Sequence, residues 1–185
     1  MPKLTDLVPK PDPKSVNTGL QQCPTAKLIQ LHGLPADPLP AEPLGLDAIT
    51  NKWWRDRMVT EDVGPFRVTG FKPAVIHLRR SLNKVQARKP QLFKVLGSAG
   101  MLAVRHVRGV PGTPSNHAFG MGIDFTIAGR LDQMGDNMVM RGSLELYSIL
   151  KEDLWYWLGA AKREDGMHWE ASKQLINRWI AEGLL

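Results

Sequence analysis

The sequence predicts a small α+β domain in which an antiparallel sheet has one face covered by helices. Two segments, residues 122–127 and 167–170, alternate apolar side chains with small or polar ones, which is typical of strands with one buried face. Three further segments carry apolar residues at helical spacing, each beginning at a proline or serine that favours a helix start. We therefore expect a sheet with one polar face and one face packed against helices.

Both predicted strands offer a polar side chain on the face opposite the core. The period of two turns Asp124 outward in the first strand and His168 outward in the second. The residues expected to face inward are Ile123, Phe125, Ile127, Met167 and Trp169. The two strands are therefore expected to present Asp124 and His168 to a common site.

Helical spacing and start signals define the three predicted helices. The first begins at Pro73, ends before Pro90 and is expected to bury Val75, Ile76, Leu78, Leu82 and Val85. Ser143 is expected to cap the second, with Leu144, Tyr147 and Leu150 on its buried face. Ser172 is expected to cap the third, which would bury Leu175, Ile176, Trp179 and Ile180.

The sequence allows more than one interpretation for each of three segments. Trp53 and Trp54 either stack on a sugar or peptide ligand or serve as core residues, which is the commoner role. The Trp-Tyr-Trp run at 155–157 is either a wall of a substrate groove or a core strand. Residues 129–142 form a predicted hairpin or loop beside the site, with Asp132 and Asp136 as turn residues and not as ligands.

Composition divides the chain into an N-terminal segment and one domain. Residues 1–45 are rich in proline and predict an extended arm or a linker, with 26–31 as the only short regular element. Residues 46–185 are expected to form the functional domain. At 185 residues and 43% hydrophobic composition, the chain can bury one core and does not suggest two equal domains.

Three residues, His117, Asp124 and His168, form a set that suits a hydrolytic zinc ion. Such an ion needs about three protein ligands and leaves a further position open for water. Gly120 and Gly122 let the loop that carries His117 fold back over the strand of Asp124, because glycines permit close backbone approach. The remaining histidines belong to no such set and are expected to be ordinary core or surface residues: His32, His77 and His106.

Asp165, three residues before His168, is the predicted general base. Zinc lowers the pKa of a bound water to roughly 7, and a nearby carboxylate can take its proton and pass it to the leaving amine. Glu164 is the competing candidate, but the spacing favours Asp165. Ser115 is expected to be a loop residue whose hydroxyl bonds nearby backbone, since no histidine is free to activate it as a nucleophile.

These residues resemble a known family. The run S-N-H-A-F-G-M-G-I-D at 115–124 and D-G-M-H at 165–168 are similar to the patterns S-x-H-x-x-G-x-A-x-D and D/E-x-x-H of the VanY-type peptidoglycan metallopeptidases. That family comprises zinc D-alanyl-D-alanine carboxypeptidases and L-alanyl-D-glutamate endopeptidases. Gly122 stands where the family usually has alanine, a small-for-small change. The likeness covers about two thirds of the chain, from Gly64 to Ile180.

The resemblance implies roles for particular residues. It implies that His117, Asp124 and His168 bind zinc and that Asp165 is the catalytic base. It also implies that an arginine upstream of the serine-histidine motif binds the substrate and the developing oxyanion. Arg105 and Arg108 are the candidates, and on a regular strand they would face opposite sides, so that only one is expected to enter the site. Arg105 is the preferred candidate. The implied fold is that of the hedgehog and D-Ala-D-Ala peptidase group.

The sequence therefore predicts a zinc metallopeptidase that hydrolyses amide bonds in peptidoglycan stem peptides. Two bonds stay open, L-Ala-D-Glu within the stem and the terminal D-Ala-D-Ala, because the groove shape decides between them. The alternative is a non-catalytic cell-wall-binding protein that keeps zinc for stability. Nucleic acid is not an expected partner, because only the charge of +6 favours it and no recognition motif accompanies that charge.

Localisation and partners follow from weaker signals. The N-terminal residues lack the apolar stretch of a secretory signal and no run is long enough to span a membrane, which predicts a soluble product made in the cytoplasm. Action on the cell wall would then need another route out of the cell, such as that of a phage or prophage endolysin.

Cys23 is the single cysteine, so an intramolecular disulfide is excluded. A monomer is the default expectation. Six basic residues in one helical stretch predict a wall-facing patch or, more commonly, a solvated face: Arg79, Arg80, Lys84, Arg88, Lys89 and Lys94.

Overall fold

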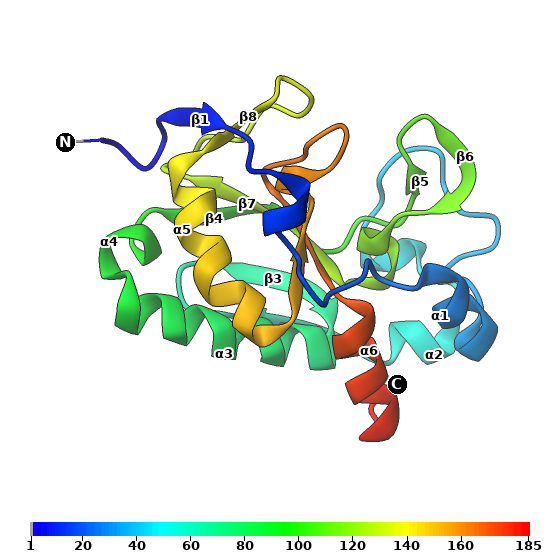
Figure 1. Ribbon diagram of the computed structural model, residues 1–185. Coiled ribbons are helices and arrows are strands. Elements are labelled where there is room, and N and C mark those ends of the chain that lie inside the picture. The colour runs from blue at the N-terminus through cyan, green and yellow to red at the C-terminus, as the bar shows by residue number, and fades with distance from the viewer. Residues whose placement is uncertain (1) are drawn as a thin grey trace.

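A four-stranded antiparallel sheet forms the centre of the computed structural model, which describes residues 2–185 apart from the side chain of Pro111 (Figure 1). Its strand order is β4-β7-β10-β9. The strands are β4 (Leu96–Gly100), β7 (Gly122–Ile127), β10 (His168–Ala171) and β9 (Trp155–Trp157). Both strands expected from alternation are therefore present and pair with each other, although β10 begins one residue later than the predicted segment.

The sheet has one apolar and one polar face, as its alternation predicts. Ile123, Phe125 and Ile127 of β7 are buried, and Trp169 of β10 packs beside Trp157 of β9 with ring centroids 5.3 Å apart. Met167 precedes β10 and is only half-buried. Asp124 and His168 lie directly opposite each other in the register of β7 and β10, so their side chains share the other face.

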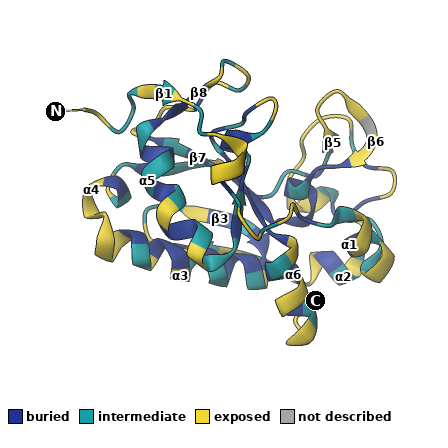
Figure 2. Ribbon diagram, in the orientation of Figure 1, coloured by how far each residue is buried: buried dark blue, intermediate teal, exposed yellow. Residues whose placement is uncertain are grey.

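Two helices cover the apolar face of the sheet. They are α3 (Lys72–Arg88) and α5 (Arg141–Leu150). The indole Nε1 of Trp155 donates to Ser81 Oγ of α3 at 3.1 Å, and the Tyr147 ring of α5 lies 5.5 Å from that of Trp157. Figure 2 shows buried residues along the inward sides of both helices. The predicted helix from Pro73 and the predicted packing are confirmed, with Ile76 only half-buried.

The second helix differs from its prediction at its start and on its buried face. It begins at Arg141 without a side-chain cap, and Ser143 is buried inside its first turn. The backbone carbonyls of Asp6 and Leu4 accept from the N–H groups of Arg141 and Gly142, at 2.9 and 2.8 Å. A distant segment thus supplies the cap. The buried face is Leu146, Ile149 and Leu150, with Leu144 and Tyr147 half-buried.

The last helix, α6 (Lys173–Ala181), follows β10 directly. Ser172 caps it as predicted, because its Oγ accepts from Leu175 N at 3.2 Å. Leu175, Ile176 and Trp179 are buried, and Ile180 is half-buried.

The remaining elements are short and surround this frame. They are η2 (Leu46–Ala48), α2 (Lys52–Arg55), the hairpin of β2 (Met58–Asp62) and β3 (Arg67–Phe71), α4 (Pro90–Phe93), the hairpin of β5 (His106–Val107) and β6 (Val110–Pro114), η3 (Asn116–Phe119), η4 (Lys151–Asp153) and η5 (Leu158–Ala160). Two of these elements bear on the candidate site. Arg105 precedes the β5–β6 hairpin and Arg108 lies in its turn, and η3 carries His117.

The proline-rich segment is packed along the domain. It holds β1 (Leu7–Pro9), η1 (Pro13–Ser15) and α1 (Thr25–His32), so the expectation of a single short element at 26–31 was wrong. The strand β1 was missed because its partner β8 (Met138–Met140) lies far away in the sequence. Leu44 also bridges Val104. In Figure 1 the segment crosses from the end of the molecule near α5 to the end near α2, as a wrapped arm and not as a free linker.

The loop before α5 is partly a strand. Residues 129–142 include β8, which pairs with β1 and not within a hairpin of the loop. Asp136 Oδ1 accepts from Met138 N at 2.9 Å, and Asp132 Oδ2 accepts from Met140 N at 2.8 Å. Both aspartates therefore accept hydrogen bonds from backbone N–H groups of the loop, as expected of turn residues. Asp132 is nevertheless buried, unlike an ordinary turn residue.

The tryptophans at 53–54 and 155–157, whose roles the sequence left open, belong to the core. Trp54 is fully buried and its Nε1 donates to Gly33 O at 2.9 Å, while Trp53 stacks on His32 with ring centroids 3.4 Å apart. Trp155 and Trp157 are buried in β9. The core interpretation of both pairs is thus the one that the packing supports.

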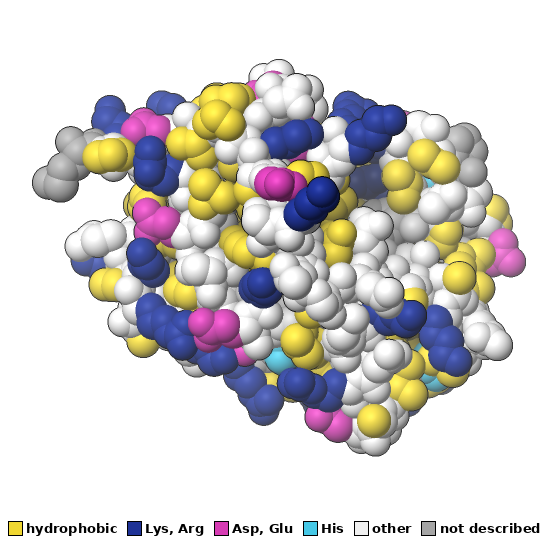
Figure 3. Space-filling view, viewed as in Figure 1, with side chains coloured by type: hydrophobic (Ala, Val, Ile, Leu, Met, Phe, Trp, Pro, Cys, Tyr) yellow, Lys and Arg dark blue, Asp and Glu magenta, His cyan; other side chains and the backbone are white. Residues whose placement is uncertain are grey.

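The basic residues of α3 lie on a surface shared with acids. Figure 3 shows acidic side chains among the basic ones there. The ion pairs join Arg79 to Glu61, Lys84 to Asp153, Arg88 to Glu152 and Lys89 to Glu145. This pattern is that of a solvated, paired face. Among residues 2–185, none of the helices combines the length and the apolar character needed to cross a membrane.

We predict that Gly120→Ala destabilises the fold more than Gly129→Ala does. Both glycines have positive φ, +62° and +72°, and a left-handed residue costs alanine about 1–2 kcal/mol. A Cβ at Gly120 would lie 2.5 Å from Phe71 N of β3, whereas a Cβ at Gly129 meets nothing within 4 Å. Urea unfolding of both variants measures the difference. Equal losses would mean that the close approach to β3 contributes nothing.

Candidate metal centre

Three ligand atoms converge on the polar face of the sheet. His117 Nε2 lies 3.0 Å from His168 Nδ1 and 3.2 Å from Asp124 Oδ1, and His168 Nδ1 lies 2.9 Å from Asp124 Oδ1. Within the described residues these three form a cluster able to hold a metal ion, as the sequence predicted. His117 and His168 are buried, while 24% of the Asp124 side chain is exposed. The cluster is therefore accessible mainly from the side of Asp124.

Local backbone geometry brings His117 to the strands. Ser115 caps η3, because its Oγ accepts from His117 N at 3.3 Å, which is the backbone role predicted for it. Gly120 then ends the turn in the left-handed conformation and leads into β7. A Cβ at Gly122 would lie 3.1 Å from His168 Cε1 and 3.4 Å from His117 N. The expected close approach at these glycines is therefore present.

Hydrogen bonds on the far side of each imidazole select the nitrogen that faces the cluster. His117 Nδ1 lies 3.1 Å from Met101 O, a carbonyl that only accepts, so a neutral His117 ring carries its proton on Nδ1 and leaves Nε2 free to bind a metal. His168 Nε2 lies 3.3 Å from Glu170 Oε2, so a neutral His168 ring carries its proton on Nε2 and leaves Nδ1 free in the same way. Both free nitrogens point at Asp124 Oδ1. Such outer partners are what metal-binding histidines usually have.

The charges of the cluster are strongly coupled. Burial disfavours the ionised form of Asp124, but hydrogen bonds from His117 and His168 outweigh it and hold the pKa of Asp124 well below its usual range. Burial likewise lowers the pKa of His168, but hydrogen bonds to Asp124 and Glu170 outweigh it and raise that pKa to about 10. The cluster therefore favours a cation, either a proton or a metal ion, between its imidazoles and carboxylates.

Asp165 lies beside the cluster without belonging to it. Its backbone oxygen accepts from His168 N at 3.2 Å, while its Oδ1 is buried and has no hydrogen-bond partner among residues 2–185. Burial, the largest cause, raises the pKa of Asp165; the charge of His168 opposes the shift and that of Asp124 adds to it. A buried carboxylate oxygen free of protein partners is available to bind a proton or a water.

Glu164, the competing candidate for the general base, makes its contacts outside the cluster. Its Oε1 accepts from Asn137 N at 2.8 Å, and its Oε2 lies 3.4 Å from Lys10 Nζ. The side chain is 1% exposed. These contacts tie Glu164 to the N-terminal segment and to the loop before β8, which favours Asp165 as the carboxylate of the site.

The two candidate arginines line one cavity. Arg105 precedes β5 and Arg108 lies in the turn between β5 and β6, so the expectation that they stand on a regular strand was wrong. The cavity has a volume of about 420 Å³ and is lined by residues 105–110 and by Ala41, Glu42 and Pro43. Burial and the charge of Arg108 lower the pKa of Arg105, and the carboxylate of Asp124 opposes this shift. Arg105 therefore lies near enough to Asp124 to be affected by its charge, and its Nη1 donates to His106 O at 2.9 Å.

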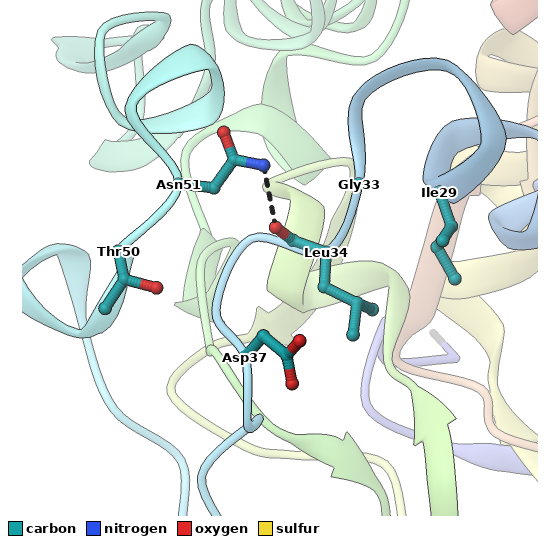
Figure 4. Close-up of a pocket in the computed structure, with 6 residues that line it drawn as sticks. All are labelled: Ile29, Gly33, Leu34, Asp37, Thr50 and Asn51. Carbon is teal, nitrogen blue, oxygen red and sulfur yellow. Dashed lines mark hydrogen bonds between the residues drawn. The ribbon is translucent and has the colours of Figure 1, made fainter.

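A second cavity, of about 520 Å³, lies apart from these residues (Figure 4). It is lined by Ile29, Gly33, Leu34, Asp37, Thr50 and Asn51. Asn51 is committed to the fold, because its Nδ2 donates to His32 O and Leu34 O at 2.7 and 3.0 Å. None of the cluster residues lines either cavity.

Sequence reasoning missed two residues of the site. Glu170 is buried against His168, and Asn116 Nδ2 donates to Glu170 Oε2. The signal for Glu170 was present, because the same period of two that turns His168 outward turns the residue two places later to the same face. Asn116 gave no comparable signal, since its neighbour in the fold is 54 positions away.

Comparison of the chain with protein-family models, curated proteins and solved structures found no match.

We predict that the purified chain binds one divalent metal ion and that His117→Ala abolishes this binding. Removal of His117 leaves two ligands, too few for a stable site. His106→Ala is the matched control, because His106 lies in the β5–β6 hairpin outside the cluster. Native mass spectrometry counts the bound ion. Equal metal content in both variants would exclude His117 as a ligand.

Proposed function

We propose that this protein is a zinc-dependent peptidase that cuts amide bonds in peptidoglycan stem peptides. The observation that carries the proposal is the convergence of His117 Nε2, His168 Nδ1 and Asp124 Oδ1 beside the unpartnered carboxylate oxygen of Asp165. The sequence motifs similar to those of VanY-type metallopeptidases supply the substrate class. The α+β arrangement, with helices on one face of the sheet and ligands on the other, agrees with the fold expected of that group.

Zinc suits the donor set better than other common ions do. Two imidazoles and one carboxylate are typical of catalytic zinc sites, and bonds of about 2.0–2.1 Å separate tetrahedral ligand atoms by about 3.3–3.4 Å. The three separations here, 2.9–3.2 Å, are close to that triangle. When bound, zinc would polarise a carbonyl and lower the pKa of a water to roughly 7.

Protein residues supply the other catalytic roles in this proposal. Asp165 accepts the proton of the attacking water and returns it to the leaving amine. Arg105, whose charge reaches Asp124, stabilises negative charge that develops on the carbonyl oxygen. Arg108 lines the same cavity and adds attraction for a substrate carboxylate. Met101 O holds the imidazole of His117 in orientation.

Both candidate bonds place a carboxylate near the cut. D-Ala-D-Ala ends in a free carboxylate, and D-Glu carries one next to the L-Ala-D-Glu bond. The arginine-lined cavity suits either group, so product analysis is needed to choose between them. An endolysin role would fit either bond.

The alternative is a wall-binding protein with a structural metal. A structural zinc site is usually closed by four protein ligands, whereas the cluster here supplies three and exposes Asp124. This difference favours catalysis.

We predict that the zinc-loaded protein releases peptides from purified peptidoglycan and that Asp165→Asn slows release by about 10²–10⁴-fold, the usual contribution of a general base. Glu164→Gln is the matched control, because it neutralises the adjacent carboxylate, which is turned toward Lys10. Mass spectrometry of the products identifies the bond: new amino termini at D-Glu indicate the endopeptidase, and free D-Ala indicates the carboxypeptidase.

Absence of any product from the zinc-loaded wild type, with one equivalent of metal confirmed, would reject the peptidase and favour the wall-binding alternative. Equal rates for wild type and Asp165→Asn would remove Asp165 from the mechanism.

A further inference from the structure

Glu170 is a fully buried carboxylate on the ligand face of the sheet. It is 1% exposed and lies in β10, two residues after His168. Among residues 2–185 its ion-pair partner is His168 and not a lysine or arginine. A buried carboxylate is costly unless its oxygens are satisfied by close partners. The partners of the Glu170 carboxylate therefore indicate its role.

Three donors from three parts of the chain converge on Glu170. Oε2 lies 3.3 Å from His168 Nε2 and also accepts from Asn116 Nδ2, which neighbours the ligand His117. Oε1 accepts from the backbone N–H of Cys23 at 2.8 Å. The carboxylate thus joins both histidine-bearing segments to the N-terminal segment.

We infer that Glu170 is a positioning residue for the metal ligand His168, and that the N-terminal segment takes part in the metal centre by holding Glu170 through Cys23 N–H. The carboxylate keeps the proton of His168 on Nε2 and directs Nδ1 at Asp124. Loss of such an outer partner typically weakens metal binding by about 10–100-fold.

The contact at Cys23 belongs to a short clasp between residues 21–23 and the start of α6. Lys173 N donates to Gln21 O at 2.9 Å, and Gln21 N donates to Gln174 Oε1 at 3.0 Å. The clasp fixes the Cys23 N–H close to the end of β10. Because coupling between two sites is reciprocal, metal binding at His168 should in turn stabilise this clasp.

A purely structural role for Glu170 makes a different prediction. It requires that loss of the carboxylate lowers stability without a specific change in metal affinity. Glu164 offers the matched comparison: it is also 1% exposed and also bonded to the N-terminal segment, through Lys10, but it touches no ligand of the cluster. Glu164→Gln therefore reproduces the loss of a buried charge without the loss of a ligand's partner.

The first test measures zinc affinity of the full chain, by competition with a chelator, for wild type, Glu170→Gln and Glu164→Gln. Glutamine at 170 offers a single acceptor oxygen to three donors, so we expect affinity to fall by about 10–100-fold. We expect Glu164→Gln to stay within about threefold of wild type. Unchanged affinity in Glu170→Gln, or an equal fall in both variants, would overturn the inference.

The second test needs no variant and so holds if Glu170→Gln fails to fold. Hydrogen exchange of the wild type, read by mass spectrometry with and without zinc, is compared for residues 21–24 and for β1. In residues 21–24 the exchanging backbone amides are those of Gln21, Gln22 and Cys23, because proline has none. We expect zinc to slow exchange in residues 21–24 at least about tenfold and to leave β1 unchanged, because β1 pairs with β8 and not with the cluster. Unchanged exchange in residues 21–24 would separate the N-terminal segment from the metal centre.

The inference rests on the metal site of the proposed function but not on peptidase activity. Normal zinc coupling without peptide release would reject the peptidase and keep the role of Glu170. Peptide release with no effect of Glu170 on zinc affinity would do the reverse.

Discussion

The antiparallel pairing of β7 with β10 is the constraint on which both the core and the candidate site depend. Its register sets Asp124 opposite His168 and Ile123 opposite Trp169. A shift by one residue would turn every side chain of one strand to the other face. Burial of the apolar face beneath α3 and α5 therefore also aligns the candidate metal ligands Asp124 and His168. The energy that aligns them comes largely from the core, not from the site itself.

Charge balance is the second constraint on the site. Asp124 and Glu170 place two carboxylates against His117 and His168 in a region largely shielded from water. Isolated charges in such a region cost several kcal/mol each, so the arrangement is stable only with compensating positive charge. A proton on His168 or a metal ion can supply this charge. The ring nitrogens that face Asp124 lie where a metal ion could be held.

The N-terminal segment links these two constraints. It caps α5 through the carbonyls of Leu4 and Asp6, pairs with β8 through β1 and reaches Glu170 through Cys23 N–H. Each of these contacts is made by backbone groups, which explains how a proline-rich stretch of low regularity supports the domain. Its side chains contribute separately, as Lys10 does with Glu164.

Local pattern by itself determined the strands β7 and β10, the helices α3 and α6, and the candidate ligands His117, Asp124 and His168. The strands and helices depend on periodicity and capping among near neighbours, and the candidate ligands on residue type and motif spacing, all of which the sequence displays directly. Only the tertiary structure decided the start of α5, the strand β1, the engagement of Glu164 and the position of Glu170 behind His168. In the first three cases the deciding partner lies at least 27 positions away. The alternation marked the face of Glu170 but not its donors Asn116 and Cys23, which lie 54 and 147 positions away. Backbone groups carry no sequence signature of where they will bond, so such partners become visible only once the chain has folded.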